Sequence, residues 1–337
     1  MNVLVDMAHP AHVHLFKHFI NYLKKTGRTV VVTSREKDVT NDLLKHYGID
    51  YVSLSKAQNG QWRLARELII RNIKILNLHR KYRFSLALGT SASIAHLTAI
   101  SGVKSFVFEE DDDDIVPLFA RITYPFATRI VVPSCLRYKR WKDKRVFHNT
   151  LHELAYLHPD IFTPDEGVLD KYGLVPRKYV IVRLSALKAH HDVGIKGLKD
   201  LGKEVSNLFD GYRILESREA NKRQPIDPWD MHSVLYFAKM LVSDSQTMSI
   251  EAAVLGVPSI RYNSFVGRIS VIEDLEKKYA LTFGFKPGQE REMLEKIEVL
   301  LNMNNLRESF EKRRRNLLDD KENFTAWMIN YFQPYLS

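Results

Sequence analysis

Short apolar runs alternate with helical patterns from the first residues of the chain. The stretch HLFKHFINYLKKTG, residues 14–27, predicts a helix with one buried face. Its apolar positions recur at helical spacing: Leu15, Phe16, Phe19, Ile20 and Leu23. Similar patterns predict strands at 2–7, 29–34, 50–54, 84–91, 104–110 and 128–134, and helices at 38–48 and 92–102. Because strands alternate with helices, we predict a parallel sheet wound on both faces.

The polarity of the chain rises near residue 160, and the alternation then restarts. It predicts strands at 179–185, 211–217, 240–245 and 258–263, and helices at 194–208, 230–239 and 248–256. The fold class is therefore predicted as α/β, with two Rossmann-like doubly wound domains that face a central cleft. We place the domains at residues 1–160 and 161–337, the second ending in charged helices. Ligands bind such sheets beyond the carboxyl ends of the strands.

Composition is ordinary for a globular protein of two domains, with 337 residues of which 45% are hydrophobic and 27% charged. The single cysteine, Cys135, excludes an internal disulfide framework and suits a reducing compartment. The first residues, MNVLVDMAHP, show neither a signal-peptide pattern nor a long apolar segment. We therefore expect a cytoplasmic protein.

Positive charge is unevenly distributed along the chain, whose net charge of +10 indicates an anionic partner. Residues 62–84 carry seven Arg or Lys against one Glu, interleaved with bulky apolar residues, and a second basic cluster spans 137–145. Both segments could be solvated helix faces. The first also suits an anionic membrane surface, with Arg63, Arg66, Arg71 and Lys74 as its basic contacts. No helix-turn-helix, RNA-binding or zinc signature accompanies the charge, so we expect no nucleic acid as partner.

Loops at predicted strand ends of the first half hold candidate catalytic groups. His9 and His12 follow the first strand. The spacing of histidines in this segment fits no known metal motif, so we expect no metal. We predict His12 as general base, with His9 as a second candidate. The loop with Gly89 and Ser91 can approach a ligand closely. The acidic run 109–114 could be a flexible surface loop. Alternatively, its first two residues, Glu109 and Glu110, could position an acceptor hydroxyl or act in acid/base catalysis.

Loops at strand ends of the second half suit a phosphorylated ligand. Arg183 and Ser185 follow one strand and would suit a diphosphate. Another strand leads into a helix that we predict to start at Ser249, behind a polar loop that would bind phosphate with free N–H groups. That loop contains Ser245, Gln246 and Thr247. Glu251 would lie in the first turn, either as a charge favoured by the helix dipole or as the acceptor for a ribose diol.

The segment DSQTMSIEAAVLGVP resembles the DSGGxQEEAxxLGxP segment of non-hydrolysing UDP-N-acetylglucosamine 2-epimerases, which have the GT-B glycosyltransferase fold. The first loop is similar to the GGTGGHVFP loop of the peptidoglycan N-acetylglucosaminyltransferase, without its glycine pairs. Together with DMAHPAHVHLFK and YLHP, the segment most resembles a family of predicted glycosyltransferases, domain of unknown function 354. The resemblance implies that Ser245 and the two residues after it hold a diphosphate, that Glu251 holds the ribose, and that Met231 and His232 lie near the base.

Three functions remain open at this point. We favour a metal-independent glycosyltransferase that needs no cofactor beyond its nucleotide-sugar donor, which the resemblance implies is UDP-linked. The acceptor would be a glycan or a lipid-linked envelope saccharide, with Gly89, Ser91 and Glu109 on the acceptor side and the enzyme held peripherally on the inner membrane face. The alternatives are an enzyme like the 2-epimerases and a binding module without catalysis.

Overall fold

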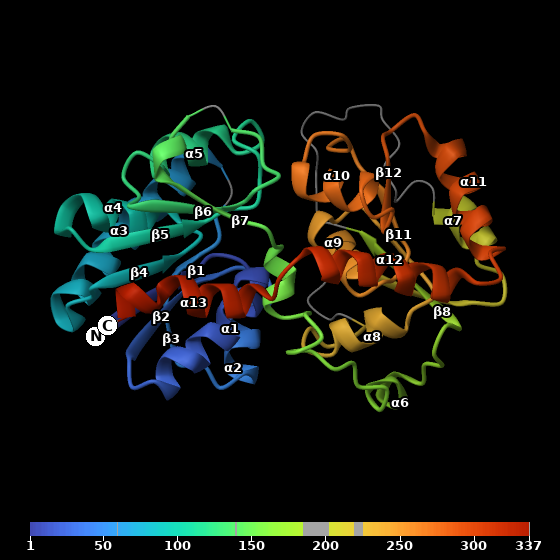
Figure 1. Cartoon of the computed structure of the whole chain (residues 1–337), viewed down its shortest axis with the longest axis horizontal. Coiled ribbons are helices and arrows are strands. Elements are labelled where there is room, and N and C mark those ends of the chain that lie inside the picture. Colours follow the sequence, from blue (N-terminus) through green and yellow to red (C-terminus); the bar gives the residue numbers. More distant parts are fainter. Residues whose placement is uncertain (59, 139, 185–201, 219–224, 337) are drawn as a thin grey trace. The chain divides into compact units, whose positions relative to one another are not determined.

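The computed structural model describes residues 1–58, 60–138, 140–184, 202–218 and 225–336, and the chain divides into two compact units (Figure 1). The first unit comprises Met1–Tyr156 and Glu322–Ser337, and the second comprises Leu157–Lys321. Each unit contains one sheet of parallel strands. The prediction of two doubly wound α/β domains is therefore confirmed.

The sheet of the first unit has the strand order β3-β2-β1-β4-β5-β6-β7. Its strands are β1 (Asn2–Met7), β2 (Thr29–Glu36), β3 (Tyr51–Lys56), β4 (Leu86–Gly89), β5 (Lys104–Phe108), β6 (Arg129–Pro133) and β7 (Arg145–His148). Its helices are α1 (Pro10–Lys25), α2 (Thr40–His46), α3 (Gln61–Tyr82), α4 (Ala92–Ser101), α5 (Pro117–Thr123) and α13 (Phe324–Leu336), with 3-10 turns η1 (Lys142–Lys144) and η2 (His152–Ala155). In Figure 1, α1, α2 and α13 lie on one side of this sheet, and α3, α4 and α5 lie on the other.

The sheet of the second unit has the order β12-β11-β10-β8-β9. Its strands are β8 (Tyr179–Leu184), β9 (Arg213–Arg218), β10 (Leu241–Ser243), β11 (Ser259–Tyr262) and β12 (Thr282–Phe285). Its helices are α6 (Val168–Tyr172), α7 (Gly202–Leu208), α8 (Met231–Phe237), α9 (Gln246–Val254), α10 (Ser270–Lys277), α11 (Glu290–Leu301) and α12 (Leu306–Asp320). α8, α10 and α12 pack beside α9, whereas α11 packs beside α7, so helices cover both faces of this sheet too.

The predicted helix in residues 14–27 begins earlier than expected, at Pro10. Proline suits the first turn because its fixed φ is helical and it lacks an N–H that would need an acceptor. His9 precedes it as the N-cap, and its Nδ1 accepts the N–H of Ala11 at 3.3 Å. The five apolar positions predicted for the inner face are all buried. His12 therefore lies in the first turn of α1 rather than in a loop.

The last helix, α13, corrects the predicted domain boundary. The chain leaves the first unit after Tyr156 and returns at Glu322, so residues 322–337 do not belong to the second domain as predicted. Phe332 packs with ring centroids 5.7 Å from Phe19 and 4.9 Å from Phe106. An amphipathic pattern shows that a helix has an apolar face, but not which of two cores receives that face.

Two short strands, β7 and β12, were not predicted. β7 begins at Arg145, inside the basic cluster that was interpreted as a solvated helix face. That interpretation is wrong for Arg145, which is 7% exposed and donates to both carboxylate oxygens of Asp113 at 2.6 and 2.7 Å. A four-residue strand that contains a buried charge has no apolar run by which it could be recognised.

A fully buried carboxylate, that of Asp6, ties together four elements of the first unit. It lies near the end of β1 and accepts hydrogen bonds from Thr33 Oγ1 on β2 at 2.6 Å and from Ser91 Oγ before α4. Arg71 Nη2 on α3 lies 2.7 Å from both of its oxygens. Arg71 is itself only 4% exposed. A buried ion pair is stable only when its remaining hydrogen-bonding capacity is satisfied, as it is here for Asp6.

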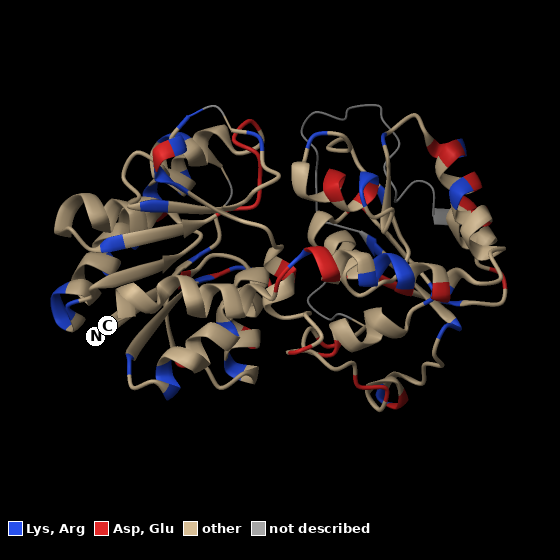
Figure 2. Ribbon diagram, in the orientation of Figure 1, with Lys and Arg blue, Asp and Glu red and all other residues tan. Residues whose placement is uncertain are grey.

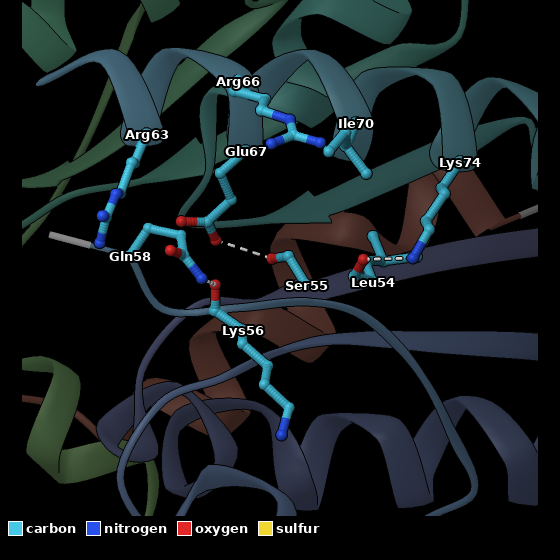
Figure 3. A pocket seen from close by; sticks show the side chains of 9 residues that line it. All are labelled: Leu54, Ser55, Lys56, Gln58, Arg63, Arg66, Glu67, Ile70 and Lys74. Atoms are coloured by element: carbon cyan, nitrogen blue, oxygen red, sulfur yellow. Dashed lines mark hydrogen bonds between the residues drawn. The ribbon is translucent and has the colours of Figure 1, made fainter. Parts of the chain in front are cut away.

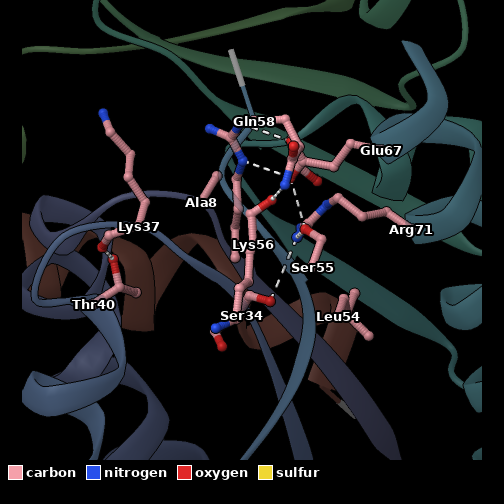
Figure 4. A network of polar contacts seen from close by, with 12 residues as sticks. Ala8, Ser34, Lys37, Thr40, Leu54, Ser55, Lys56, Gln58, Glu67 and Arg71 are labelled. Atoms are coloured by element: carbon pink, nitrogen blue, oxygen red, sulfur yellow. Dashed lines mark hydrogen bonds and ion pairs between the residues drawn. The ribbon is translucent and has the colours of Figure 1, made fainter. Parts of the chain in front are cut away.

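Helix α3 carries six Lys or Arg against one acidic residue, Glu67. Figure 2 marks the Lys and Arg residues of the chain in blue and its Asp and Glu residues in red. Glu67 accepts hydrogen bonds from Arg35 at 2.7 and 2.9 Å. It also accepts one from Ser55 Oγ at 2.7 Å (Figure 3). Arg71 also donates to Ser55 Oγ, at 3.2 Å, which joins the two ion pairs into one network (Figure 4). Grouping Arg71 with the basic contacts of a membrane face was therefore wrong, because its charge faces the core.

No helix within the described ranges combines the length and the apolarity needed to cross a membrane.

Replacing Arg71 by Met should lower the free energy of unfolding by about 3–5 kcal/mol, because Asp6 would keep a buried charge without its partner. Urea unfolding followed by circular dichroism measures this. The matched control is Arg80→Gln, an exposed position on the same helix, which should change stability by less than about 0.5 kcal/mol. Equal stability of the Arg71 variant and the wild type would contradict the role given to this ion pair.

Candidate active site

Each sheet reverses its winding direction beside its first strand. In the first unit the chain passes from β1 to β2 and β3 and then crosses to β4, on the other side of β1; in the second it passes from β8 to β9 and then crosses to β10. At these two places Asp6 pairs with Gly89, and Arg183 pairs with Ser243. Ligands of doubly wound sheets bind at such switch points, because the loops beyond the strand ends diverge there. Of the predicted site residues, His9, His12, Gly89 and Ser91 lie on or next to these loops in the first unit, and Arg183, Ser245, Gln246 and Thr247 do so in the second.

His12 makes two contacts through one ring nitrogen at the switch point of the first unit. Its Nδ1 accepts the N–H of Ala8 at 3.2 Å and lies 2.5 Å from Thr90 Oγ1, in the loop after β4. A main-chain N–H can only donate, so Nδ1 must carry a lone pair. In the neutral imidazole the proton is then on Nε2. His12 is therefore arranged to donate a hydrogen bond from Nε2, while the lone pair on Nδ1 is already engaged, which disfavours the predicted role of His12 as a general base.

The pKa of His12 lies well below its ordinary value. Burial is the main cause, and the positive potential of His9, His152 and Lys37 adds to it. The ring of His9 lies 5.8 Å from that of His12, and its Nδ1 also accepts a main-chain N–H, so neutral His9 too has its proton on Nε2. His12 is therefore suited to donating a hydrogen bond at neutral pH without carrying a positive charge, and neutral His9 would donate through the same ring atom.

The loop after β4 mainly positions the residues of this site and contributes little to its surface. A Cβ at Gly89 would lie 2.4 Å from the carbonyl oxygen of Asp6, so this position requires glycine. The hydroxyl of Ser91 is bound to Asp6, which makes Ser91 a positioning residue. Thr90, which lies between them and contacts His12, was not among the predicted residues. Its place in the hydroxyl-rich stretch GTSAS was the signal that could have identified it.

The acidic run 109–114 is partly built into the fold. Asp112 is fully buried and accepts the main-chain N–H of Arg137 at 2.6 Å, and Asp113 pairs with Arg145 as described above. The alternative of a flexible surface loop is therefore wrong for these two residues. Their ion pairs fix the loop that begins with Glu109 and Glu110.

Glu109 and Glu110 differ in their surroundings. Burial and the neighbouring Asp111 raise the pKa of Glu109 to about 8, although its Oε1 accepts the N–H groups of Glu110 and Asp111, both at 3.1 Å. Glu109 thus holds a proton at neutral pH. Glu110 Oε2 lies 3.2 Å from Nδ1 of His152, which is 7% exposed. His152 also lowers the pKa of His12. Glu110 and His12 therefore share one electrostatic environment around His152.

In the second unit, helix α9 begins at Gln246, three residues before the predicted start. Ser245 is its N-cap and accepts the N–H of Met248 through Oγ at 3.5 Å. Gln246 and Thr247 are half-buried in the first turn, as is Ser245 before it. Glu251 consequently lies in the second turn, and no acidic residue lies in the first. The interpretation of Glu251 as a first-turn charge on the helix dipole is therefore wrong.

Glu251 instead faces a histidine from the preceding helix. Its Oε1 lies 3.1 Å from Nε2 of His232 on α8, and both residues are 6% exposed. Met231, half-buried, begins the same helix. Burying a carboxylate is costly unless hydrogen bonds satisfy it. The buried pair of Glu251 and His232, behind the start of α9, therefore indicates a functional role and not only a surface charge.

Two further residues were predicted for a diphosphate in this unit. Arg183 lies near the end of β8, and its Nη1 donates to Ser217 Oγ on β9. Ser185 lies outside the described residues. In the part of the chain that the structure describes, no group of three or more His, Cys, Asp or Glu side chains is placed to hold a metal ion.

Residues 1–271 match the family described as "Protein of unknown function (DUF354)". The chain belongs to this family. An uncharacterized protein of Methanocaldococcus jannaschii is 22% identical over 280 residues, which cover 77% of this chain and 81% of that protein.

Two solved structures share the fold of this DUF354 protein. The UDP-GlcNAc 2-epimerase of Neisseria meningitidis, bound to UDP-GlcNAc, matches with a TM-score of 0.73 and 12% identity, over 98% of this chain and 99% of its own. CalG4, the calicheamicin glycosyltransferase, matches with a TM-score of 0.56 and 12% identity, over 99% and 98%. At such low identities the likeness establishes the GT-B type of fold.

The raised pKa of Glu109 predicts a pH dependence of stability. An unfolded glutamate loses its proton near pH 4.3, whereas folded Glu109 keeps it up to about pH 8. The folded state binds more protons across this window, so the contribution of Glu109 to stability falls as the pH rises, by up to about 1.4 kcal/mol per pH unit. Glu109→Gln should remove this slope in urea unfolding across the window. Asp114→Asn, at an exposed position of the same loop, should keep it; an unchanged slope in the Glu109 variant would contradict the raised pKa.

Proposed function

We propose that this protein is a glycosyltransferase that moves a sugar from a nucleotide-sugar donor to an acceptor hydroxyl. The observation that carries the proposal is the buried pair of Glu251 and His232 behind the start of α9, at the switch point of the second unit. The GT-B type of fold and the likeness to sugar-nucleotide enzymes support it.

The donor would bind to the second unit. The first N–H groups of α9 have no partner within the helix, and with Ser245 they suit the oxygens of a diphosphate. His232 holds Glu251 in one orientation, and an oriented carboxylate suits the two hydroxyls of a ribose. Arg183, on the strand beside β10, would add positive charge near the diphosphate. By analogy with the epimerase bound to UDP-GlcNAc, we propose a UDP-linked sugar.

The acceptor would bind to the first unit. Its oxygen forms a bond to the anomeric carbon while the bond from that carbon to the diphosphate oxygen breaks, and the electron pair of that bond leaves with the diphosphate. We assign the acceptor proton to Glu110, because Glu109 already holds a proton at neutral pH and Nε2 of His12 carries one. The Nε2–H groups of His9 and His12 would stabilise negative charge that develops in the transition state, without a metal ion.

We further propose that the acceptor is a glycan or lipid-linked saccharide of the cell envelope and that the enzyme works at the inner face of the membrane. The exposed face of α3, with Trp62 90% exposed, supports this location.

A second candidate function, epimerisation of the donor sugar, is favoured by Glu109. Acid/base chemistry at a sugar carbon needs one group that removes a proton and another that returns it. Neighbouring carboxyl groups with different proton affinities are a recurrent arrangement for such chemistry, and Glu109, protonated at neutral pH, lies directly before Glu110.

Incubation with UDP-GlcNAc and no acceptor separates the candidates. A transferase should release UDP slowly by transfer to water and leave the configuration at C2 unchanged. An epimerase should produce the C2 epimer. Tight binding of UDP-GlcNAc without any turnover would contradict both and indicate a binding module.

Glu251→Gln should weaken UDP binding by about 1.5–3 kcal/mol, the usual contribution of a hydrogen bond to a charged group. Isothermal titration calorimetry measures the change. The control is Glu298→Gln, at an exposed position of α11 in the same unit, which should bind UDP as the wild type does. Unchanged affinity in a folded Glu251 variant would show that this carboxylate does not contact the nucleotide.

Two substitutions of His12 distinguish a hydrogen-bond donor from a base. If Nε2–H donates, His12→Gln should keep turnover within about tenfold of the wild type, because the glutamine amide can place an N–H near the same point, whereas His12→Ala should lose about 100-fold. A base cannot be replaced by an amide. Equal losses in the two variants would therefore restore His12 to the role of general base.

A further inference from the structure

A cationic pocket of about 370 Å³ lies between the end of β3 and the first half of α3 (Figure 3). Its cationic lining residues are Lys56, Arg63, Arg66 and Lys74. Among the described lining residues, Glu67 is the acidic one, and Ile70 forms part of the wall. The pocket belongs to neither of the switch points described above, so the proposed reaction leaves it without a role.

The charge of Glu67 is already balanced by a residue outside the pocket lining. Burial raises the pKa of Glu67, but hydrogen bonds from Arg35 and Ser55 and the positive charge of Arg35 outweigh this effect, so the net pKa is lowered. Glu67 is thus ionised and bound by Arg35 at 2.7 and 2.9 Å. Glu67 is therefore not free to neutralise the four lining cations.

Two of these cations have no partner in the described chain. Nζ of Lys74 donates to a main-chain carbonyl of β3 at 2.6 Å, and Nζ of Lys56 lies 3.2 Å from Glu36 Oε1. Arg63 and Arg66, in contrast, make no hydrogen bond or ion pair with any residue that the structure describes. Two unpaired guanidinium groups at one pocket are suited to an oxyanion, because each can donate two parallel hydrogen bonds to phosphate oxygens.

An apolar stripe on the solvent side of α3 adjoins this pocket. Trp62, Ile69 and Ile73 are 90%, 59% and 55% exposed. They lie seven and four positions apart, which places them on one face of the helix, and Arg66 falls on the same face. Ile70, 37% exposed, joins the stripe to the pocket wall.

Large apolar side chains rarely remain together on a surface that contacts only water. An apolar helix face bordered by Arg and Lys is typical of helices that lie in the interface of an anionic bilayer, and tryptophan is enriched at that depth. Here the cations beside the stripe form a pocket, so they can bind one headgroup as well as attract a charged surface.

We propose that the α3 pocket binds the phosphate group of an anionic lipid through Arg63 and Arg66, while Trp62, Ile69 and Ile73 enter the bilayer surface. This inference deepens the membrane location proposed above and rests on that part of it. The pocket would bind one lipid headgroup specifically, whereas charge alone would attach this face of α3 to a membrane only weakly. Its test measures lipid binding and not turnover, so the proposed reaction and the lipid site can fail separately.

Vesicle co-sedimentation tests the site with a matched pair of double variants. The vesicles are phosphatidylcholine with roughly 30 mol% phosphatidic acid, close to the charge of an anionic leaflet. The first variant, Arg63→Gln with Arg66→Gln, changes the pocket. The second, Arg80→Gln with Lys81→Gln, removes the same charge from the same helix about 21 Å from Arg66.

The pocket variant should lose at least tenfold in vesicle affinity, and the control variant less than threefold. Equal losses would show that binding depends on net charge alone and would overturn the lipid site. Ile69→Ser with Ile73→Ser should also lose at least tenfold, because the stripe would no longer enter the bilayer. Thermal melting followed by circular dichroism checks that each variant folds, which we expect because the changed side chains are exposed.

Inorganic phosphate and glycerol 3-phosphate distinguish a lipid from a soluble anion. Under the proposal, neither binds measurably by calorimetry at concentrations at which the vesicles bind, because the stripe contributes to affinity only at a bilayer. Binding of either compound to wild-type protein, abolished in the pocket variant and accompanied by no vesicle binding, would overturn the proposal and assign the pocket to a free phosphate.

Discussion

The first unit depends on one buried charge, the carboxylate of Asp6. It receives hydrogen bonds from Thr33, Arg71 and Ser91, which lie on β2, on α3 and at the start of α4. Removing Arg71 would leave this charge buried without its partner, which costs several kcal/mol. The network therefore fixes α3 and the loop after β4 against the end of β1. That loop carries Thr90, whose hydroxyl contacts His12.

The same network divides α3 into two faces with different roles. Glu67 and Arg71 point inward and are satisfied by partners on the strands, whereas Arg63 and Arg66 remain beside a pocket next to the exposed Trp62. A basic helix that was read from composition as one cationic surface is therefore partly a structural element. Only its outer face is available for an anionic partner.

Both units place their candidate chemistry at the point where the sheet changes winding direction. In the first unit this point brings the start of α1 beside the loop after β4, and in the second it brings the end of β8 beside the start of α9. Helix starts supply N–H groups there, and buried partners orient the side chains. His232 orients Glu251, and the N–H of Ala8 selects the tautomer of His12.

The amino-acid sequence alone determined the α/β alternation, most of the elements and the candidate loops, because hydrophobic periodicity and strand-end polarity are local properties. It also identified Glu251 and His232 as candidate site residues, but it did not predict that they contact each other. Only the tertiary structure decided that α13 returns to the first unit, that Arg71 is buried, that Glu109 has a raised pKa and that His12 has its proton on Nε2. The state of Glu109 depends on its burial beside Asp111, and that of His12 on an amide four residues away that occupies a lone pair. The other two features depend on partners distant in sequence: a core that accepts an apolar face, and a carboxylate that pairs with a guanidinium. Local patterns carry no information about such partners.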